Sequence, residues 1–366
     1  MNAYFDLDKG PGRRAFRMRH VGGVLVAAAL GATLAVPVLL GGRDILSTML
    51  RFPTSGYIAL FAVIAASWLF RAVKLHMLLH RLDVPAGFPQ ALGISLAMDF
   101  AFMATPGGVG GYAAGVYYLR RAGASASGAT TLTAADQGLD LMFFALALPL
   151  AGMVLYGSNV PETWSILASA TAGLALTLVL AALLVRRKWH RTWLSLTNAV
   201  STRWPALRRH EQAAHEFCAN LRVQFRVLAA GGPLFLGCVF ALTALQWLTR
   251  YGVLWLALAL LGHHVSFALT LSLQALVTHA AQWTGVPAGG GGAELGLSAA
   301  LVSRVPASDL ATALLLWRLA TLYVGLIAGA IAIALLARRR DPQATVATPV
   351  LAMPVEECAR EGALPG

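Results

Sequence analysis

The sequence predicts an all-α polytopic membrane protein with about six full spans plus two re-entrant helical hairpins, arranged as an inverted repeat. Of its 366 residues, 58% are hydrophobic and 12% are charged, and the mean hydropathy is +0.67, which is too apolar for a soluble domain of this length. The apolar residues form blocks of roughly 20 to 30, the length that a helix needs to cross about 30 Å of hydrocarbon. Two further blocks are interrupted by proline and glycine.

The uninterrupted blocks predict the full spans. These are expected at Val21–Leu40, Tyr57–Leu79, Thr130–Tyr156, Trp164–Val185, Pro233–Leu261 and Leu310–Ala337. Basic residues ahead of Val21 give the first block some likeness to a secretory signal, but its apolar run is longer than that of a typical signal peptide. We therefore expect an uncleaved first span.

The two interrupted blocks predict the hairpins. The first runs from Ala91 to Leu119 and is broken by Pro106-Gly107-Gly108-Val109-Gly110-Gly111. The second runs from Val265 to Val302 and is broken by Pro287-Ala288 and the glycines Gly289–Gly292. In each, the apolar piece after the break is too short to span the bilayer. Irregular backbone survives at membrane depth only against protein or a water-filled cavity, so the breaks also predict a cavity.

The basic residues predict the orientation, because cytoplasmic loops retain Lys and Arg. If each hairpin enters and leaves by one face, most of the 28 Lys and Arg residues are cytoplasmic. They lie in the N-terminus 1–20, the flank Arg71–Arg81, the pair Arg120–Arg121, the loop 186–230 and the tail. If the second block were instead an ordinary span followed by a cytoplasmic loop, Arg338–Arg340 would fall on the wrong face. We expect an inner-membrane protein with both termini cytoplasmic.

The same topology divides the chain into two membrane repeats, 21–160 and 161–340, each with the order span, span, hairpin, span. Their orientations are opposite, an arrangement typical of transporters, whose sites lie near the midplane where broken helices meet. The basic loop 186–230 is expected to form amphipathic helix on the inner leaflet or a solvated loop. The tail 341–366 is polar and rich in Pro and Ala, which predicts disorder.

Ionisable residues at membrane depth are functional candidates because burying them costs a few kcal/mol. Five residues qualify: Asp99, Asp136, Asp140, Glu294 and Arg318. Asp136 and Asp140 share a helix face and repel each other unless a cation lies between them, and Arg318 is the partner we expect. Either a headgroup or proton site, or a structural salt bridge between the halves, accounts for this group.

The glycine-rich breaks admit two interpretations. Their backbone N–H groups could receive a lipid phosphate, or glycine could merely permit tight turns and close packing. Glu294 follows the second break, where it could cap a helix or face the cavity. The candidate substrate-binding residues are Asp136, Asp140, Glu294, Arg318, Gly107, Gly108, Gly110, Gly290 and Gly291, and the candidate gating residues are Asp99, Pro106 and Pro287.

Other chemistry is not supported. Cys218, Cys238 and Cys358 lie far apart, and His263, His264 and His279 have no second ligand at metal spacing. No nucleophile with a neighbouring base is recognisable, so we expect no enzymatic activity, cofactor or metal. The net charge of +12 sits at the ends of apolar blocks, which argues against nucleic acid.

Several of these motifs resemble a known family, the flippase-like transmembrane domain of lysylphosphatidylglycerol synthases. The resemblance rests on Thr105-Pro106-Gly107-Gly108-Val109-Gly110-Gly111, Leu119-Arg120-Arg121-Ala122-Gly123, Asp136-Gln137-Gly138-Leu139-Asp140, the run from Pro287 to Glu294, and Trp317-Arg318-Leu319. It covers about residues 20 to 340. Two positions depart from the family pattern: Gln137 stands where an arginine is usual, and Tyr112 where a glutamate is usual.

The resemblance implies a membrane domain that moves a lipid between leaflets, here without the soluble aminoacyltransferase domain of the full-length synthases. We therefore expect a stand-alone translocator of an anionic or aminoacylated phospholipid, with homo-oligomerisation left open. Two alternatives remain: an enzyme or accessory protein of lipid-linked glycan synthesis, and an ion-coupled transporter of a small solute.

Overall fold

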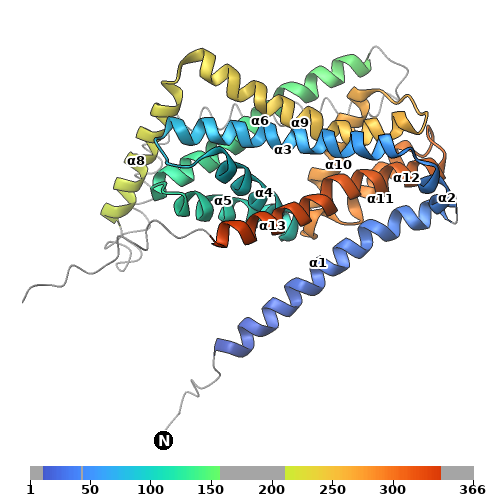
Figure 1. The fold of residues 1–366 in the computed structure, drawn as a ribbon, viewed down its shortest axis with the longest axis horizontal. Coiled ribbons are helices and arrows are strands. Elements are labelled where there is room, and N and C mark those ends of the chain that lie inside the picture. The colour runs from blue at the N-terminus through green and yellow to red at the C-terminus, as the bar shows by residue number, and fades with distance from the viewer. Residues whose placement is uncertain (1–10, 43, 157–210, 339–366) are drawn as a thin grey trace, which may run out of the picture.

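The computed structural model describes residues 11–42, 44–156 and 211–338, and the regular elements in these ranges are helices (Figure 1). In chain order they are α1 (Pro11–Gly41), α2 (Asp44–Arg51), α3 (Thr54–Arg81), α4 (Phe88–Ala104), η1 (Pro106–Gly108), α5 (Val109–Arg121), α6 (Ala126–Tyr156), α8 (Glu211–Ala229), α9 (Gly232–Leu260), α10 (Phe267–Trp283), η3 (Pro287–Gly289), α11 (Gly292–Leu301), α12 (Ala307–Arg318), the π-helix η4 (Leu319–Tyr323) and α13 (Val324–Arg338).

Within the described residues, four helices are long and apolar enough to cross a membrane. They are α3, α6, α9 and the continuous run α12–η4–α13. A fifth candidate combines α1 with α2, which are bent by 96° at the break between them. The all-helical class is confirmed, and so are helices at five of the six positions where spans were expected. The sixth, Trp164–Val185, lies outside the described residues, as do the tail 341–366 and much of the loop 186–230.

The core forms where α3 and α9 pack along each other, the most extensive helix contact among the described elements. Leu60 and Ile64 of α3 are buried there against Leu254 and Leu258 of α9. The outer surface is also apolar: Leu39 is 83% exposed and Leu234 80% exposed. A soluble protein would bury such residues, so this surface suits contact with lipid.

Each interrupted block folds as a helix, a short break and a second helix. Before the first break Thr105 is extended, and Gly107 and Gly108 then take left-handed φ angles of 62° and 72°. At the second break Ala288 and Gly289 take φ angles of 54° and 62°. The two breaks therefore share left-handed backbone at two successive residues, even though alanine adopts this region at a cost of about 1–2 kcal/mol. They differ at the next residue, where Val109 is helical and Gly290 is extended, with ψ angles of −33° and 129°.

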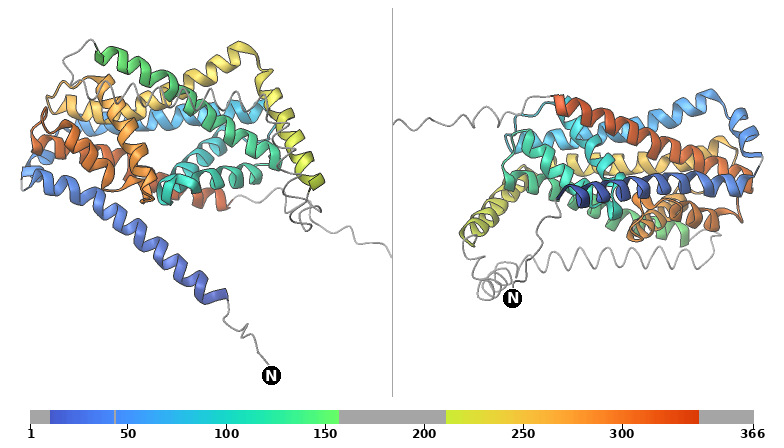
Figure 2. Two further views of the ribbon diagram at one scale, coloured as in Figure 1. Left: turned by 180° about the vertical axis from the view of Figure 1, so that it is seen from behind. Right: turned by 90° about the horizontal axis from the view of Figure 1, so that it is seen from below.

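The two breaks contact each other. The hairpin α4–η1–α5 occupies one end of the molecule and α10–η3–α11 the other, as Figure 1 and its back view in Figure 2 both show. η1 contacts η3, η1 also contacts α10, and η3 also contacts α4 and α1. Opposed hairpins of this kind are what an inverted repeat requires; their entry from opposite faces of a bilayer stays a prediction.

The helix α1 has two parts. Its C-terminal part packs on α12 and approaches the second break so closely that a Cβ on Gly290 would lie 2.5 Å from the Ala29 carbonyl oxygen. Its N-terminal part stands away from the bundle (Figures 1 and 2). The predicted basic N-terminus 1–20 is therefore helical from Pro11 onward.

Helix α8 covers the end of the bundle at which α3 and α5 terminate, where it contacts α6 and α3 (Figure 1). It is the described part of the predicted basic loop and is amphipathic in sequence, with Arg222 and Arg226 among its polar residues. Of the two expectations for this loop, amphipathic helix or solvated loop, the described part is helix. Its position on the inner leaflet stays a prediction.

Candidate functional site

Four helices bring six ionisable side chains together in one buried charge network. The cations come from α3 and α9 and the carboxylates from α4 and α6: Arg71, Lys74 and Arg250 face Asp99, Asp136 and Asp140. Three positive and three negative groups balance in formal charge. Buried charges persist in proteins when they are paired and hydrogen-bonded in this way.

Arg71 lies at the centre of the network. One of its terminal nitrogens, Nη1, bonds Asp99 Oδ1, and Nη2 donates to Asp136 Oδ2 at 3.0 Å. Lys74 Nζ lies 2.7 Å from Asp136 Oδ1 and 3.3 Å from Asp140 Oδ1. Arg250 Nη1 donates to Asp99 Oδ2 at 3.0 Å, so the chain of ion pairs joins α6 through α3 and α4 to α9.

The cation between Asp136 and Asp140 is thus Lys74, and the expected pairing of these aspartates with Arg318 is wrong. The need for a cation was correctly inferred from their spacing of four residues on one helix. The partner was missed because α6 packs on α3, α5 and α10, whereas Arg318 of α12 bonds a different carboxylate.

The assignment of Arg71 and Lys74 to a cytoplasmic flank is also wrong. The Lys74 side chain is fully buried and that of Arg71 is 10% exposed. Arg71 lies ten residues before Arg81, the end of α3, which is about 15 Å along a helix axis. That depth was the available signal, because snorkelling to an interface does not extend so far.

A second ionic pair braces the second break. Arg318 Nε donates to Glu294 Oε1, and Arg318 Nη1 lies 3.4 Å from the carbonyl oxygen of Ala288. The Trp317 ring lies under the guanidinium, 4.4 Å from its carbon. Glu294 makes no helix-capping bond at the start of α11, so its charge is directed to Arg318 instead.

Each side chain of this pair has one polar atom without a hydrogen-bond partner among the described residues. The Glu294 side chain is fully buried and that of Arg318 is 6% exposed. Glu294 Oε2 and Arg318 Nη2 have no hydrogen-bond partner among the described residues. One acceptor and one donor of this ion pair are therefore buried without a partner among the described residues, and a buried polar atom left unpaired costs about 1–3 kcal/mol.

The glycines of the breaks are needed for packing. A Cβ on Gly108 would lie 2.6 Å from the Phe102 ring, and one on Gly110 would lie 2.7 Å from Thr105 Oγ1. The Gly110 N–H already donates to Thr105 Oγ1 at 2.9 Å. Gly291 requires its φ of 79°. These contacts favour the packing interpretation over a phosphate cradle at the first break.

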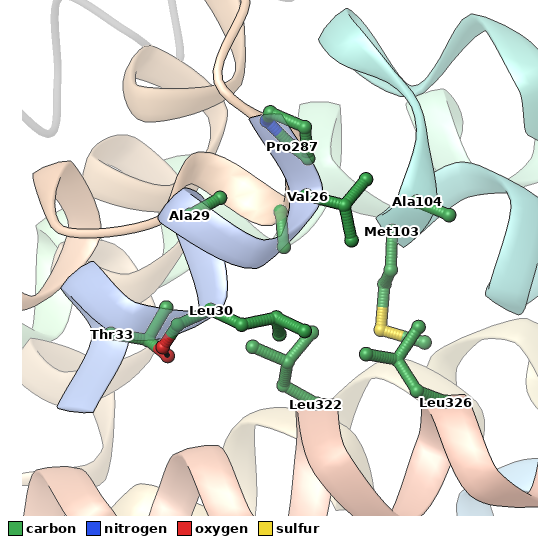
Figure 3. A pocket seen from close by; sticks show the side chains of 10 residues that line it. Val26, Ala29, Leu30, Thr33, Met103, Ala104, Pro287, Leu322 and Leu326 are labelled. Atoms are coloured by element: carbon green, nitrogen blue, oxygen red, sulfur yellow. Dashed lines mark hydrogen bonds between the residues drawn. The ribbon is translucent and has the colours of Figure 1, made fainter. Parts of the chain in front are cut away.

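A small apolar cavity of about 10 Å³ lies where α1 leaves the bundle. Leu30, Met103, Leu322 and Leu326 converge on it (Figure 3). Ala288 also lines it, so the residue whose carbonyl faces Arg318 touches apolar space as well. The cavity has room for about one water molecule.

The predicted site residues therefore separate into groups. Asp99, Asp136 and Asp140 share the charge network, while Glu294 and Arg318 meet at the second break. Pro106, Gly107, Gly108 and Gly110 form or flank the first break, and Pro287, Gly290 and Gly291 the second. Sequence reasoning missed Arg71 and Lys74 as site residues and gave no role to Arg250.

Histidine and acidic residues elsewhere in the described chain form isolated contacts. In the described part of the chain, no three His, Cys, Asp or Glu side chains are grouped so as to hold a metal ion. His263 Nε2 lies 2.8 Å from Asp309 Oδ2, near the end of the bundle where α9 terminates. His279 Nδ1 lies 2.6 Å from the Ala275 carbonyl oxygen in its own helix.

Comparison with known proteins agrees with the motifs and the helical fold. The family model described as the lysylphosphatidylglycerol synthase TM region matches residues 21–329. A curated relative from Archaeoglobus fulgidus, named UPF0104 membrane protein, is 22% identical over 284 residues, which cover 75% of this chain and 85% of the relative. The resemblance inferred from the motifs is confirmed: this multi-pass integral membrane protein belongs to the lysylphosphatidylglycerol synthase TM-region family.

Proposed function

We propose that this protein moves a phospholipid or a related lipid between the leaflets of the inner membrane, and that Glu294 and Arg318 contact its headgroup. The family description supports a lipid-related role, because it carries the name of a lipid-modifying synthase. The observation that carries the proposal is the second break, where irregular backbone lies beside a buried donor and acceptor without partners.

The chemistry of the pair fits a phospholipid headgroup. Arg318 Nη2 is a charged donor, and guanidinium groups bind phosphate oxygens with strong, directional hydrogen bonds. Glu294 Oε2 can accept from a hydroxyl or an ammonium group on the same headgroup. A headgroup bound here replaces lost hydration with two protein contacts, which lowers the cost of taking a polar group into the bilayer.

The charge network has a different role in this proposal. Asp136 and Asp140 hold α6 to α3 through Lys74, and Asp99 holds the first hairpin. These bonds keep the breaks in register while the acyl chains stay in the surrounding lipid. The distribution of Lys and Arg predicts that both termini and the loop 186–230 are on the cytoplasmic side.

The test is lipid movement in reconstituted vesicles. Fluorescent phospholipid in the outer leaflet is bleached by a membrane-impermeant reductant, and the protected fraction is followed over time. We expect Arg318→Ala to slow translocation at least about tenfold, which corresponds to about 1.4 kcal/mol. Arg318→Lys, which keeps the charge but loses the fork of donors, should be intermediate.

The matched control is Arg304→Ala, an exposed arginine outside both ionic groups. It should translocate as the unchanged protein does. Equal transport by Arg318→Ala and the unchanged protein, at equal expression, would show that the headgroup site is wrongly assigned. Uptake of soluble solutes into the same vesicles, with no lipid movement, would favour the small-solute transporter.

A further inference from the structure

Helices α3 and α9, which make the most extensive contact among the described helices, carry the same short motif. Trp68-x-x-Arg71 lies in α3 and Trp247-x-x-Arg250 lies in α9, and each arginine stands ten residues before the last residue of its helix. The helices that follow, α4 and α10, are both 17 residues long and begin with phenylalanine. Arg71 and Arg250 therefore occupy corresponding positions in the two halves.

These corresponding arginines bind the same carboxylate. Arg71 bonds Asp99 Oδ1 and Arg250 bonds Asp99 Oδ2. The position in α10 that corresponds to Asp99, the twelfth residue of each helix, is Thr278, and its hydroxyl donates to the Gln274 carbonyl oxygen in its own helix. One hairpin thus supplies the only carboxylate that ties both arginines together in the described structure.

The two arginines differ in what else they bind. Arg71 has a second carboxylate, Asp136, and its side chain is 10% exposed. Arg250 has one carboxylate contact among the described residues, and its side chain is 19% exposed, the highest value in the network. A guanidinium offers five N–H donors, and among the described residues one ion pair of Arg250, to Asp99, is present. The Trp247 ring centre lies 6.0 Å from the guanidinium carbon.

We propose that Arg250 binds a phosphate-type anion at the junction of the two halves, with Asp99 as the internal counter-ion that the anion partly replaces. Arg71 binds two carboxylates, Asp99 and Asp136. Arg250 also binds Asp99, and the ligand supplies to Arg250 the second anionic group that Asp136 supplies to Arg71. A phosphodiester has two charged oxygens, which suit the paired donors of a guanidinium.

That the phosphate belongs to a lipid rests on the proposed function, whereas anion binding at Arg250 does not. The network also explains what binding does. An anion on Arg250 competes with Asp99, which keeps its bond to Arg71. The ion pair between α9 and α4 then weakens, while the ion pair between α3 and α4 remains. Ligand binding therefore loosens the first hairpin from α9, which belongs to the second half.

The experiment uses the full-length protein purified in detergent, with two probes: phosphatidylglycerol, measured by native mass spectrometry, and inorganic phosphate, measured by its effect on the melting temperature. Diacylglycerol, which has no phosphate, is the negative control. Arg250→Gln should weaken phosphatidylglycerol binding at least about tenfold. Its melting temperature without ligand should fall, because Asp99 loses one of its two arginines, so binding is compared at a temperature at which the variant is folded. Arg304→Gln is the matched control and should leave both measurements unchanged.

Asp99→Asn separates an anion site from a structural bridge, because the two predict opposite signs. Removing the competing carboxylate should tighten anion binding several-fold, although the protein itself becomes less stable. Unchanged affinity for both probes in Arg250→Gln, or weaker binding in Asp99→Asn, would overturn the proposal. Tighter binding of phosphate but not of phosphatidylglycerol supports the anion site and identifies free phosphate as its ligand.

Failure here is distinguishable from failure of the translocator. Binding at Arg250 can be present in a protein that moves no lipid, and in that case the proposed function alone is wrong. If lipid movement depended on Arg318 but not on Arg250, the proposal that a lipid binds at Arg250 would be wrong. The proposed lipid translocation would still stand.

Discussion

At the scale of single residues, Lys74 has the most constrained environment. Its side chain is fully buried, and its ammonium group lies within 3.3 Å of two carboxylates. Removing one partner of a buried ionic group leaves the others uncompensated, which is more damaging than the pair itself is stabilising. Lys74 is therefore the residue at which the stability of the charge network is best measured.

We expect Lys74→Met to lower the free energy of unfolding by about 3–5 kcal/mol, because Asp136 and Asp140 then repel each other. Unfolding in mixed detergent, followed by circular dichroism, measures this loss. The double variant Lys74→Met with Asp136→Asn removes one carboxylate as well and should recover part of it. If the single and double variants were equally unstable, Lys74 would act through packing and not through charge.

The residue pairs could not be predicted from the sequence, whereas the candidates could. Depth within an apolar block identified Asp99, Asp136, Asp140, Glu294 and Arg318, since burial of charge is costly wherever it occurs. Their partners depend on which helix faces which, and Arg250 and Asp99 are 151 residues apart in the chain. Nothing local encodes such a contact. The motif shared by α3 and α9 could have pointed to Arg250.

At the scale of elements, the two breaks were predictable because proline and glycine disrupt helices by local chemistry. The sequence Pro106-Gly107-Gly108 requires no tertiary information to end α4. The equivalence of Ala288 and Gly107 was not predictable, since alanine rarely adopts a left-handed φ. The π-helix after Arg318 was also missed, because its sequence continues the apolar run without a signal.

The first break offers a matched pair of substitutions. Gly107 and Gly108 both have left-handed φ angles, but a Cβ on Gly107 would have no neighbour closer than 4.0 Å, whereas one on Gly108 would lie 2.6 Å from Phe102. Gly107→Ala should therefore lower stability by about 1–2 kcal/mol through backbone strain alone. Gly108→Ala should lose roughly 1–3 kcal/mol more through overpacking.

Thermal unfolding of both variants in detergent measures the difference. The comparison is internal, since the residues are adjacent and the substitution is the same. Against the background of Phe102→Ala, Gly108→Ala should lose only the strain part, because the ring that its Cβ would meet is gone. Equal losses for the two single variants would mean that Phe102 moves aside freely and that the tip of the hairpin is loosely packed.

At the scale of the whole molecule, the sequence predicted the helical class and the division into spans, because apolar length is set by the bilayer. It also predicted two hairpins, which the structure places at opposite ends of the bundle with their tips in contact. The headgroup cavity that the two breaks predict stays a prediction. Cavity size depends on packing, which periodicity does not encode.

Topology can be tested with cysteines that the chain already has. Cys218 lies on α8 at the end of the bundle, Cys238 is exposed on the apolar surface of α9, and Cys358 is in the tail. With single-cysteine variants in inverted membrane vesicles, an impermeant maleimide should label Cys218 and Cys358. Cys238 should react only after detergent replaces the lipid around it.

Right-side-out vesicles are the control, and neither Cys218 nor Cys358 should react in them. Labelling of Cys358 from outside would reverse the predicted orientation of the last span. Labelling of Cys238 in intact vesicles would place this part of α9 against water, and the apolar surface would then need another explanation.

The contact between the two breaks also bears on the ion gradient across the membrane. The tips of the two hairpins contact each other. Under the proposed function, a lipid would move along the flank with its tails in the bilayer, and the contact between the tips would oppose a continuous hydrated route for ions and protons. A membrane holding many copies of this protein should stay electrically tight and keep the gradient that drives its other transporters.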